Sequence, residues 1–310
     1  MSKYLSIAVL TFFSAIASGQ EAAKLKITIL STMVADLKGV GEWGFSALVE
    51  TDSSRILFDV GGRPNTVRDN AAELNANLSG IRQVVLSHNH KDHTAGLVTI
   101  HQQFPDGITA SVIYIAAGFF LRTAANANVG MLKADSAAYV SSGGRFIVID
   151  RPEKIGPGIY LTGPVPRRYP EKNYISDRTL ITPSGVVEDN VPEDMSMVIR
   201  TSRGLVVLTG CGHAGIVNTL EYVMQQFPGE KVVAVAGGMH LLDAKDEQLD
   251  WTANKLKAIG IQYFLGAHCT GLNSVYRIRE VTGMTKENCL VGTVGTTFDI
   301  DQGIKIGWLK

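Results

Sequence analysis

The chain of 310 residues is 45% hydrophobic and 19% charged, and its formal net charge at pH 7 is zero. This composition is typical of a globular protein with one large core, and the lack of net positive charge argues against a surface that coats nucleic acid. The sequence contains no zinc-finger cysteine spacing, no phosphate-binding Gly-Lys-Ser/Thr loop and no dinucleotide fingerprint. The classes that remain are a globular enzyme and a protein that binds a small molecule.

The amino terminus has the pattern of a secretory signal peptide over residues 1–19. Lys3 gives a short basic start, residues 4–16 form a brief apolar run, and small residues precede polar Gln20. The run is short for a membrane span, and an ordinary first strand or an anchor helix is the alternative interpretation. We therefore expect an exported protein, periplasmic or secreted, that is free of the membrane after signal removal. Residues 20–310 would then form a single domain.

The mature chain is expected to open with strands and to continue as strand, loop and helix units. Short apolar runs predict strands at 25–30, 44–51 and 55–59, with a hairpin turn at 52–54. Apolar residues at helical spacing predict helices at about 64–74, 94–104, 216–227 and 247–259. This succession is typical of an α/β protein.

Six of the seven histidines follow apolar runs, at the points where buried strands would end. They are His88, His90, His93, His213, His240 and His268. The carboxyl ends of strands in an α/β sheet open onto one edge, so loops that are distant in sequence converge there. His101 lies instead in a helix-like stretch and is interpreted as a structural residue. The pattern predicts a metal centre.

The densest part of the pattern is His88-x-His90-x-Asp92-His93. In an extended segment, residues 88, 90 and 92 would share one side, and His93 would lie on the other side or on the first turn of a following helix. One short loop could therefore serve two metal ions. Imidazole and carboxylate together suit zinc, with iron and manganese as alternatives.

This motif resembles the signature of the metallo-β-lactamase superfamily, and the resemblance covers roughly residues 25–310. The strand that ends at Asp59 resembles the family's strand whose aspartate braces the metal loop without touching substrate. His213 and His268 stand where the third and last histidine motifs of the family are expected. The resemblance implies an α/β fold, a four-layer αβ/βα sandwich with the metal site at one edge of the two sheets.

The sequence motifs at residues 209–220, 237–241 and 268–271 are more specific than the superfamily signature. They resemble the branch named after the archaeal dihydropterin ribofuranosyl-aminobenzene phosphate synthase. Many members of that branch have no established reaction, so the resemblance supports the fold and the site more than the substrate.

One position departs from the wider superfamily, whose enzymes commonly place a metal-bridging aspartate between the third and last histidine motifs. Here the strand in that interval ends at His240, which we interpret as occupying the aspartate's place. It would bind one metal, donate a hydrogen bond to a ligand, or shuttle a proton. Two divalent cations, the Asp92 carboxylate and a hydroxide would leave the site roughly two units positive, which favours an anionic substrate.

The expected ligands form two sets, with His240 close to both: His88, His90 and His213 for one metal, and Asp92, His93 and His268 for the other. With two zinc ions, a bound water with its pKa lowered towards ~7 would be the nucleophile, and Asp92 and His240 would take part in catalysis. The favoured function is an exported zinc hydrolase of an anionic phosphoester, lactone or amide. The alternatives are a synthase-like transferase acting on a pterin or ribosyl phosphate, and a metal-binding protein without turnover.

Periodicity fades over residues 151–194, which contain seven of the ten prolines. A long proline-rich segment between two metal-binding halves is a candidate flap over the substrate. It carries Arg167 and Arg168, which are candidates to meet an anionic group, although a solvated charge cluster is the other interpretation.

Two of the three cysteines, Cys211 and Cys269, adjoin the histidine loops. Each is a buried small hydrophobe, or the two form a disulfide across the edge of the site. Direct metal ligation is the third option.

Overall fold

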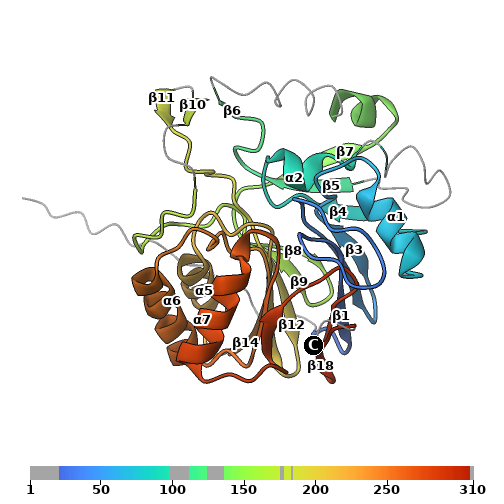
Figure 1. Ribbon diagram of the computed structural model, residues 1–310. Helices are drawn as coiled ribbons and strands as arrows, with labels where there is room; N and C mark the ends of the chain where they lie inside the picture. The colour runs from blue at the N-terminus through green and yellow to red at the C-terminus, as the bar shows by residue number, and fades with distance from the viewer. Residues whose placement is uncertain are drawn as a thin grey trace, which may run out of the picture.

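The computed structural model describes residues 21–97, 99, 112–123, 136–174, 178–182 and 184–307. The expected signal peptide at residues 1–19 and His101 lie outside the described residues. The chain forms two large sheets that face each other, with helices on the outer face of each (Figure 1).

The first sheet has eight strands in the order β18-β17-β1-β2-β3-β4-β5-β7. In chain order these are β1 (Leu25–Ser31), β2 (Ser46–Thr51), β3 (Arg55–Phe58), β4 (Gln83–Val85), β5 (Val112–Ala116), β7 (Arg145–Ile149), β17 (Thr297–Asp299) and β18 (Gly303–Lys305). Strands β1, β2 and β3 pair antiparallel, whereas β3, β4, β5 and β7 run parallel. The predicted hairpin turn at 52–54 is confirmed, because Glu50 pairs with Arg55.

The second sheet has seven strands in the order β16-β15-β14-β13-β12-β9-β8. They are β8 (Glu153–Gly156), β9 (Ile159–Leu161), β12 (Met197–Thr201), β13 (Gly204–Thr209), β14 (Val232–Gly237), β15 (Tyr263–Gly266) and β16 (Cys289–Val291). Strands β13 to β16 are parallel, so their carboxyl ends open onto one edge of the sheet.

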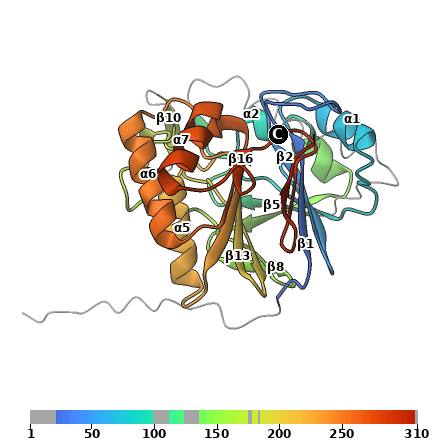
Figure 2. The same ribbon diagram turned by 60° about the horizontal axis from the view of Figure 1, so that its bottom comes forward.

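Helices cover the two outer faces. The helices in the described residues include α1 (Thr66–Glu73), α2 (Lys91–Thr94), α5 (Ile216–Gln226), α6 (Asp246–Ile259) and α7 (Leu272–Thr282), with a short 3-10 helix at His268–Thr270. Figure 2 shows α5, α6 and α7 on one side of the paired sheets and α1 on the other. None of the helices in the described part of the chain has the length and apolar character needed to span a membrane.

Three apolar clusters separate the layers. Val206 packs between the two sheets with Ile27, while its neighbour Val207 packs on the other face of β13 against Leu220 of α5. A third cluster packs Val67 of α1 against the first sheet. Adjacent strand residues point to opposite faces, so a sheet that is covered on both sides needs continuous apolar runs. The expected four-layer sandwich is confirmed.

The proline-rich segment is more regular than expected. Its first part forms β8 and β9, which complete an edge of the second sheet. Its later part forms β10 (Thr179–Thr182) and β11 (Gly185–Glu188), which join β6 (Arg122–Thr123) in a separate small sheet. This small sheet projects beyond the sandwich at the top of Figure 1. A covering role over a substrate stays a prediction.

Candidate metal centre

The candidate site is built from residues that follow the carboxyl ends of five strands. Asp59 follows β3, and the His88 loop follows β4, its parallel neighbour. In the second sheet, His213, His240 and His268 follow β13, β14 and β15. Since these strand ends share one edge in each sheet, side chains that are up to two hundred residues apart converge there.

One donor group consists of His88, His90 and His213, whose ligand atoms all lie within 4.8 Å of one another. Nε2 of His88 is 3.0 Å from Nδ1 of His90. The ring of His213 lies 4.7 Å from that of His88 and 4.9 Å from that of His90, centroid to centroid. Three imidazoles at this spacing could hold one metal ion.

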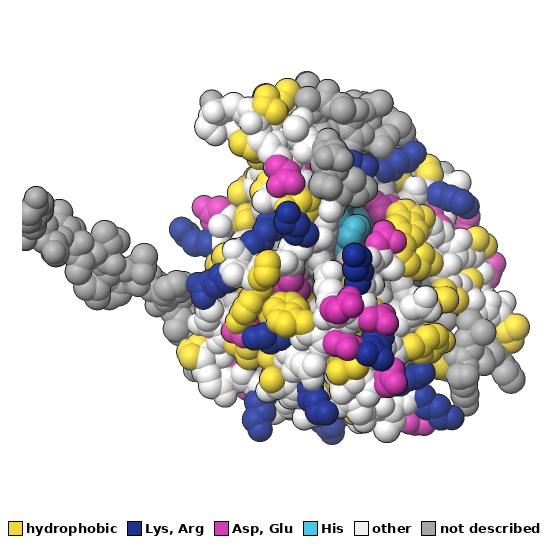
Figure 3. Space-filling view, turned by 60° about the vertical axis from the view of Figure 1, so that its left-hand side comes forward, with side chains coloured by type: hydrophobic (Ala, Val, Ile, Leu, Met, Phe, Trp, Pro, Cys, Tyr) yellow, Lys and Arg dark blue, Asp and Glu magenta, His cyan; other side chains and the backbone are white. Residues whose placement is uncertain are grey.

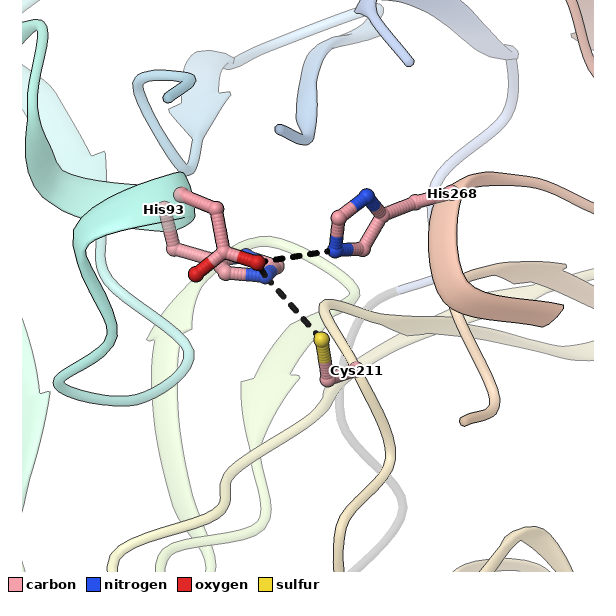
Figure 4. Close-up of side chains that lie close together, drawn as sticks. His93, Cys211 and His268 are labelled. Atoms are coloured by element: carbon pink, nitrogen blue, oxygen red, sulfur yellow. Dashed lines mark hydrogen bonds and ion pairs between the residues drawn. The ribbon is translucent and has the colours of Figure 1, made fainter. Parts of the chain in front are cut away.

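A second donor group consists of Asp92, His93, Cys211 and His268, again with ligand atoms within 4.8 Å of one another. Nε2 of His268 is 3.2 Å from Oδ2 of Asp92, and Nε2 of His93 is 3.1 Å from Sγ of Cys211. Figure 4 shows His93, Cys211 and His268 pointing toward one another from separate elements. His240 is not in this group, but forms a third, overlapping one with Cys211 and His213.

The structure brings six of the seven proposed ligands together in the two sets expected, and it places His240, which was expected close to both sets, in a third group with Cys211 and His213. One geometric expectation is wrong. Residues 88, 90 and 92 do not share one side of an extended segment, because the extended backbone ends at His90, with φ −107° and ψ 148°, and α2 begins at Lys91. Asp92 and His93 therefore lie on the first turn of α2, which turns Asp92 towards His268. Most of the helix expected at 94–104 lies outside the described residues.

Asp59 has three hydrogen bonds to its buried carboxylate. The backbone N–H of Ser87 donates to Oδ1 at 2.7 Å, and the hydroxyl of Ser87 donates to Oδ2 at 2.8 Å. Nδ1 of His93 lies 2.7 Å from Oδ2, so the proton of this imidazole sits on Nδ1. Having donated its proton to Asp59, the Ser87 hydroxyl accepts from Nδ1 of His88 at 2.9 Å. Asp59 thus leaves Nε2 of both histidines free to bind a metal.

The glycines of the loop after β13 allow its backbone to pack closely against Ser87 and Asp59. A Cβ atom at Gly210 would overlap Oγ of Ser87 and lie 2.7 Å from Oδ2 of Asp59. Gly212 has φ +60°, which favours glycine. The motif Gly-Cys-Gly-His therefore presses Cys211 and His213 against the loop that carries His88.

Non-glycine residues with left-handed backbone gather at the site. Asp59, His240 and His268 have φ values of 55°, 47° and 45°. Each conformation costs about 1 kcal/mol or more, and such strain persists where the surroundings hold the residue in place. All three follow strand ends and turn a side chain into the same region.

The histidines of the first donor group are neutral at pH 7. Burial lowers the pKa of His88 and His213 well below the usual value, and neighbouring histidines act in the same direction. Burial lowers the pKa of His90 to about 4, although Asp92 opposes the shift. Neutral imidazoles have free lone pairs, which a metal ligand requires.

Without a metal, Asp92 is ionised and His93 carries a second proton on Nε2, which a metal ion would displace. Burial opposes ionisation of Asp92, but His93 and His268 outweigh it and hold the pKa of the carboxyl well below its usual range. Burial also opposes the charge on His93, but Asp59 and Asp92 raise the pKa of the imidazole to about 9. A divalent cation near Asp92 would replace this imidazolium as the partner of the carboxylate.

The donor set fits the divalent metal that the fold implies. Nε2 of His213 and Nδ1 of His240 are buried and have no hydrogen-bond partner in the described part of the chain. Buried polar atoms without a partner are costly, and a metal ion would satisfy both. A patch of histidine is visible at the surface in Figure 3, and His90 and His240 are the histidines of the site that are partly exposed.

Residues of the proline-rich segment form hydrogen bonds with the loops that carry the histidines. The carbonyl oxygen of Asn173 lies 2.5 Å from Nδ1 of His213, which leaves Nε2 of that histidine free. The carboxylate of Asp194 accepts from the N–H of Ala214 at 2.9 Å, and that of Glu193 accepts from the N–H of Asn89 at 3.2 Å. Sequence reasoning missed these contacts.

The sequence proposed Arg167 and Arg168 as candidates to meet an anionic group, and the structure places these two arginines in different surroundings. Arg167 donates hydrogen bonds to the carbonyl oxygens of Asn190 and Val191, within the segment itself. Arg168 is exposed. Arg178, which the sequence did not single out, is exposed and lies close enough to His90 to contribute to lowering the pKa of that histidine.

One neighbour of the site, Trp43, was not predicted. The ring of Trp43 lies 4.9 Å from that of His268, and its side chain is 51% exposed, so it forms part of the rim of the site. Cys211 and Cys269 are buried free thiols with their sulfur atoms 3.2 Å apart, so the disulfide alternative is not formed. Of the three options raised for these cysteines, direct metal ligation stays open for Cys211, whose sulfur lies in a donor group.

Comparison with known proteins agrees with the fold. The family model of the metallo-beta-lactamase superfamily matches residues 44–168. The chain is 32% identical over 245 residues to the 7,8-dihydropterin-6-methyl-4-(beta-D-ribofuranosyl)-aminobenzene-5'-phosphate synthase of Methanocaldococcus jannaschii, covering 74% of this chain and 82% of that protein. It is 30% identical over 274 residues to the protein MJ0448 of the same organism, covering 88% of this chain and all of that protein.

A solved structure gives the same result. The crystal structure of Tm1679, described as a metal-dependent hydrolase of the beta-lactamase superfamily, superposes with a TM-score of 0.72 at 25% identity. The superposition covers 89% of this chain and 99% of that one. The four-layer sandwich, the strand-end histidines and these relatives lead to one conclusion: the chain belongs to the metallo-β-lactamase superfamily.

Proposed function

We propose that this chain is a binuclear, zinc-dependent hydrolase of an anionic small molecule that contains a phosphoester, lactone or amide bond. The observation that carries the proposal is the pair of adjoining donor groups, one of three imidazoles and one that contains Asp92. Binuclear sites of this kind act on acyl and phosphoryl centres. The name of the Tm1679 structure, a metal-dependent hydrolase, supports the same class.

When bound, divalent cations at these groups would activate a water molecule as nucleophile and polarise the bond under attack. The chain's own residues prepare the site for them. Asp59 fixes the protons of His93 and, through Ser87, of His88, while Asn173 fixes that of His213. Each of these imidazoles then presents Nε2. His240, half-buried with its Nδ1 unpartnered, is placed to hold or move a proton beside the first group.

Charge supports an anionic substrate. Asp92 is the one carboxylate in the three donor groups of the described residues, so two divalent cations there would be only partly neutralised. Arg178 adds a cation near His90. A phosphate or carboxylate group on the substrate would compensate this charge.

A second candidate is a synthase-like transferase that acts on a pterin or ribosyl phosphate. The identity of 32% to a protein with that synthase name favours it. It shares the metal centre and the anionic substrate, but it predicts condensation of two substrates rather than consumption of water.

The test is metal analysis of the purified chain, followed by parallel assays. Zinc-loaded protein is offered panels of phosphoesters, lactones and amides, and separately the two substrates of the synthase reaction. We expect hydrolysis that a chelator abolishes and zinc restores. His88→Ala should lower both zinc content and turnover, while His101→Ala, which alters the one histidine not proposed as a ligand, should lower neither. Full activity of metal-free protein would refute the proposal, and condensation without hydrolysis would select the synthase.

We also propose that the protein is exported. The pattern of residues 1–19 supports this, since a basic start, a short apolar run and small residues form a signal peptide. Mass spectrometry of the protein from its native source should find a mature chain that begins near Gln20 in the periplasmic or secreted fraction. An intact amino terminus in the cytoplasmic fraction would contradict this.

A further inference from the structure

We propose that Cys211 is a metal ligand whose sulfur lies between the two metal positions and takes the place of the bridging carboxylate that the wider superfamily commonly uses. The inference rests on the metal centre of the proposed function and adds an anionic ligand to it.

Cys211 belongs to two donor groups at once. Its Sγ lies within 4.8 Å of the ligand atoms of Asp92, His93 and His268, and also within 4.8 Å of those of His213 and His240. His213 also belongs to two groups, but among the described residues only Cys211 joins the group of Asp92 to a group that contains His213. A ligand that is shared between the two sides is what a bridging position requires.

No carboxylate in the relevant interval can take this role. Residues 213 to 268 are all described, and Asp243, Asp246 and Glu247, the first acids after His240 in the sequence, are exposed and absent from the donor groups. His240 brings a neutral nitrogen that cannot compensate the charge of two cations. The sulfur of Cys211 is therefore the available second anion.

The backbone holds Cys211 in this position. Gly210 packs directly against Ser87 and Asp59, and Gly212 adopts a left-handed turn, so the loop has little freedom to move away. The Cys211 side chain is 2% exposed and its sulfur lies 3.1 Å from Nε2 of His93. Figure 4 shows the sulfur facing His93 and His268.

Coordination of a metal by Cys211 would release one proton. The S–H bond breaks, a sulfur–metal bond forms, and the proton leaves to solvent as the metal enters. The thiolate lowers the net charge of the site by one unit relative to a site with His240 alone. Thiolate ligands also favour zinc over harder cations such as magnesium.

Cys269 provides a matched control. It is equally buried, and its sulfur lies 3.2 Å from that of Cys211, yet it is in none of the donor groups. Its sulfur accepts a hydrogen bond from the N–H of His240 at 3.3 Å. The two thiols should therefore behave differently towards a metal, although they are neighbours.

The decisive experiment uses the full mature chain loaded with zinc or with cobalt(II). X-ray absorption at the zinc edge should show a sulfur ligand at about 2.3 Å. The cobalt protein should show a thiolate-to-cobalt charge-transfer band in the near ultraviolet, which Cys211→Ala removes and Cys269→Ala retains. Cys211→Ser should weaken binding of at least one metal roughly tenfold or more in competition with a chelator.

The outcomes separate this inference from the proposed function. Metal bound only through nitrogen and oxygen would overturn the role of Cys211 and leave the hydrolase proposal intact. A band that is lost in Cys269→Ala and kept in Cys211→Ala would also overturn it. A chain that binds no metal would refute both proposals. If the Cys211 variants fail to fold, the zinc-edge spectrum of the unmodified chain still decides the question.

Discussion

Replacing Asp59 with asparagine should disable the metal position that includes His93 and weaken the position that includes His88, while the chain stays folded. The backbone N–H of Ser87 needs an acceptor, so the amide oxygen must replace Oδ1. The amide NH2 then takes the place of Oδ2 and donates to Nδ1 of His93, which forces the imidazole proton onto Nε2. A protonated Nε2 cannot bind a metal. Turning the amide over instead would set two donors against each other at Ser87.

The magnitude follows from these contacts. The change removes one charge-assisted hydrogen bond, worth about 1.5–3 kcal/mol, at a ligand that must be correctly protonated. Since about 1.4 kcal/mol is a factor of ten, zinc affinity at this position should fall roughly 10- to 100-fold. The same NH2 group would also donate to the Ser87 hydroxyl, which would then donate to Nδ1 of His88, so zinc affinity at the position that includes His88 should fall as well.

Zinc titration in competition with a chromophoric chelator measures this effect. Asp250→Asn is the control, because Asp250 is a surface carboxylate paired with Arg277 and lies in none of the donor groups. Circular dichroism establishes that both variants are folded. Unchanged affinity at both positions in folded Asp59→Asn would refute the argument that Asp59 sets the imidazole proton.

Three further predictions concern the surroundings of the site. Burial raises the pKa of Glu193 to about 7, so the wild type loses stability as pH rises from the unfolded value of about 4.5 through 7. Glu193→Gln removes this loss, and denaturation of metal-free protein should show the variant gaining up to about 3 kcal/mol relative to wild type between pH 5 and pH 8; a constant difference would contradict this. Gly210→Ala forces a methyl group onto Ser87 and should lower both the melting temperature and the zinc content, and normal zinc content would show that the loop can relax. Arg178→Gln should raise KM for an anionic substrate more than it lowers kcat, whereas Arg168→Gln should leave both nearly unchanged; the opposite ranking would return the anion contact to Arg168.

The sequence predicted the fold and the ligand types because both depend on local patterns. Continuous apolar runs mark strands that are covered on both faces, and the histidines at their ends mark the shared edge. The placement of Asp92 was wrong because α2 begins at Lys91, and element boundaries are decided by tertiary contacts as much as by local preference.

The supporting contacts were out of reach of sequence reasoning for a different reason. Asn173, Glu193 and Asp194 hold the metal loops across gaps of twenty residues or more, and each lies in a segment without periodicity. The sequence suggested that Arg167 contacts the substrate because it is a basic residue in a proline-rich segment. In the structure its hydrogen-bond partners are two backbone carbonyl groups of that same segment. Only the folded geometry distinguishes these roles.

The central claim is a two-metal centre at the strand ends. Anomalous diffraction from zinc-loaded crystals tests it most directly. We predict two peaks roughly 3.5–4 Å apart, one among His88, His90 and His213 and the other beside Asp92 and His268. A single peak, or peaks away from these side chains, would contradict the account.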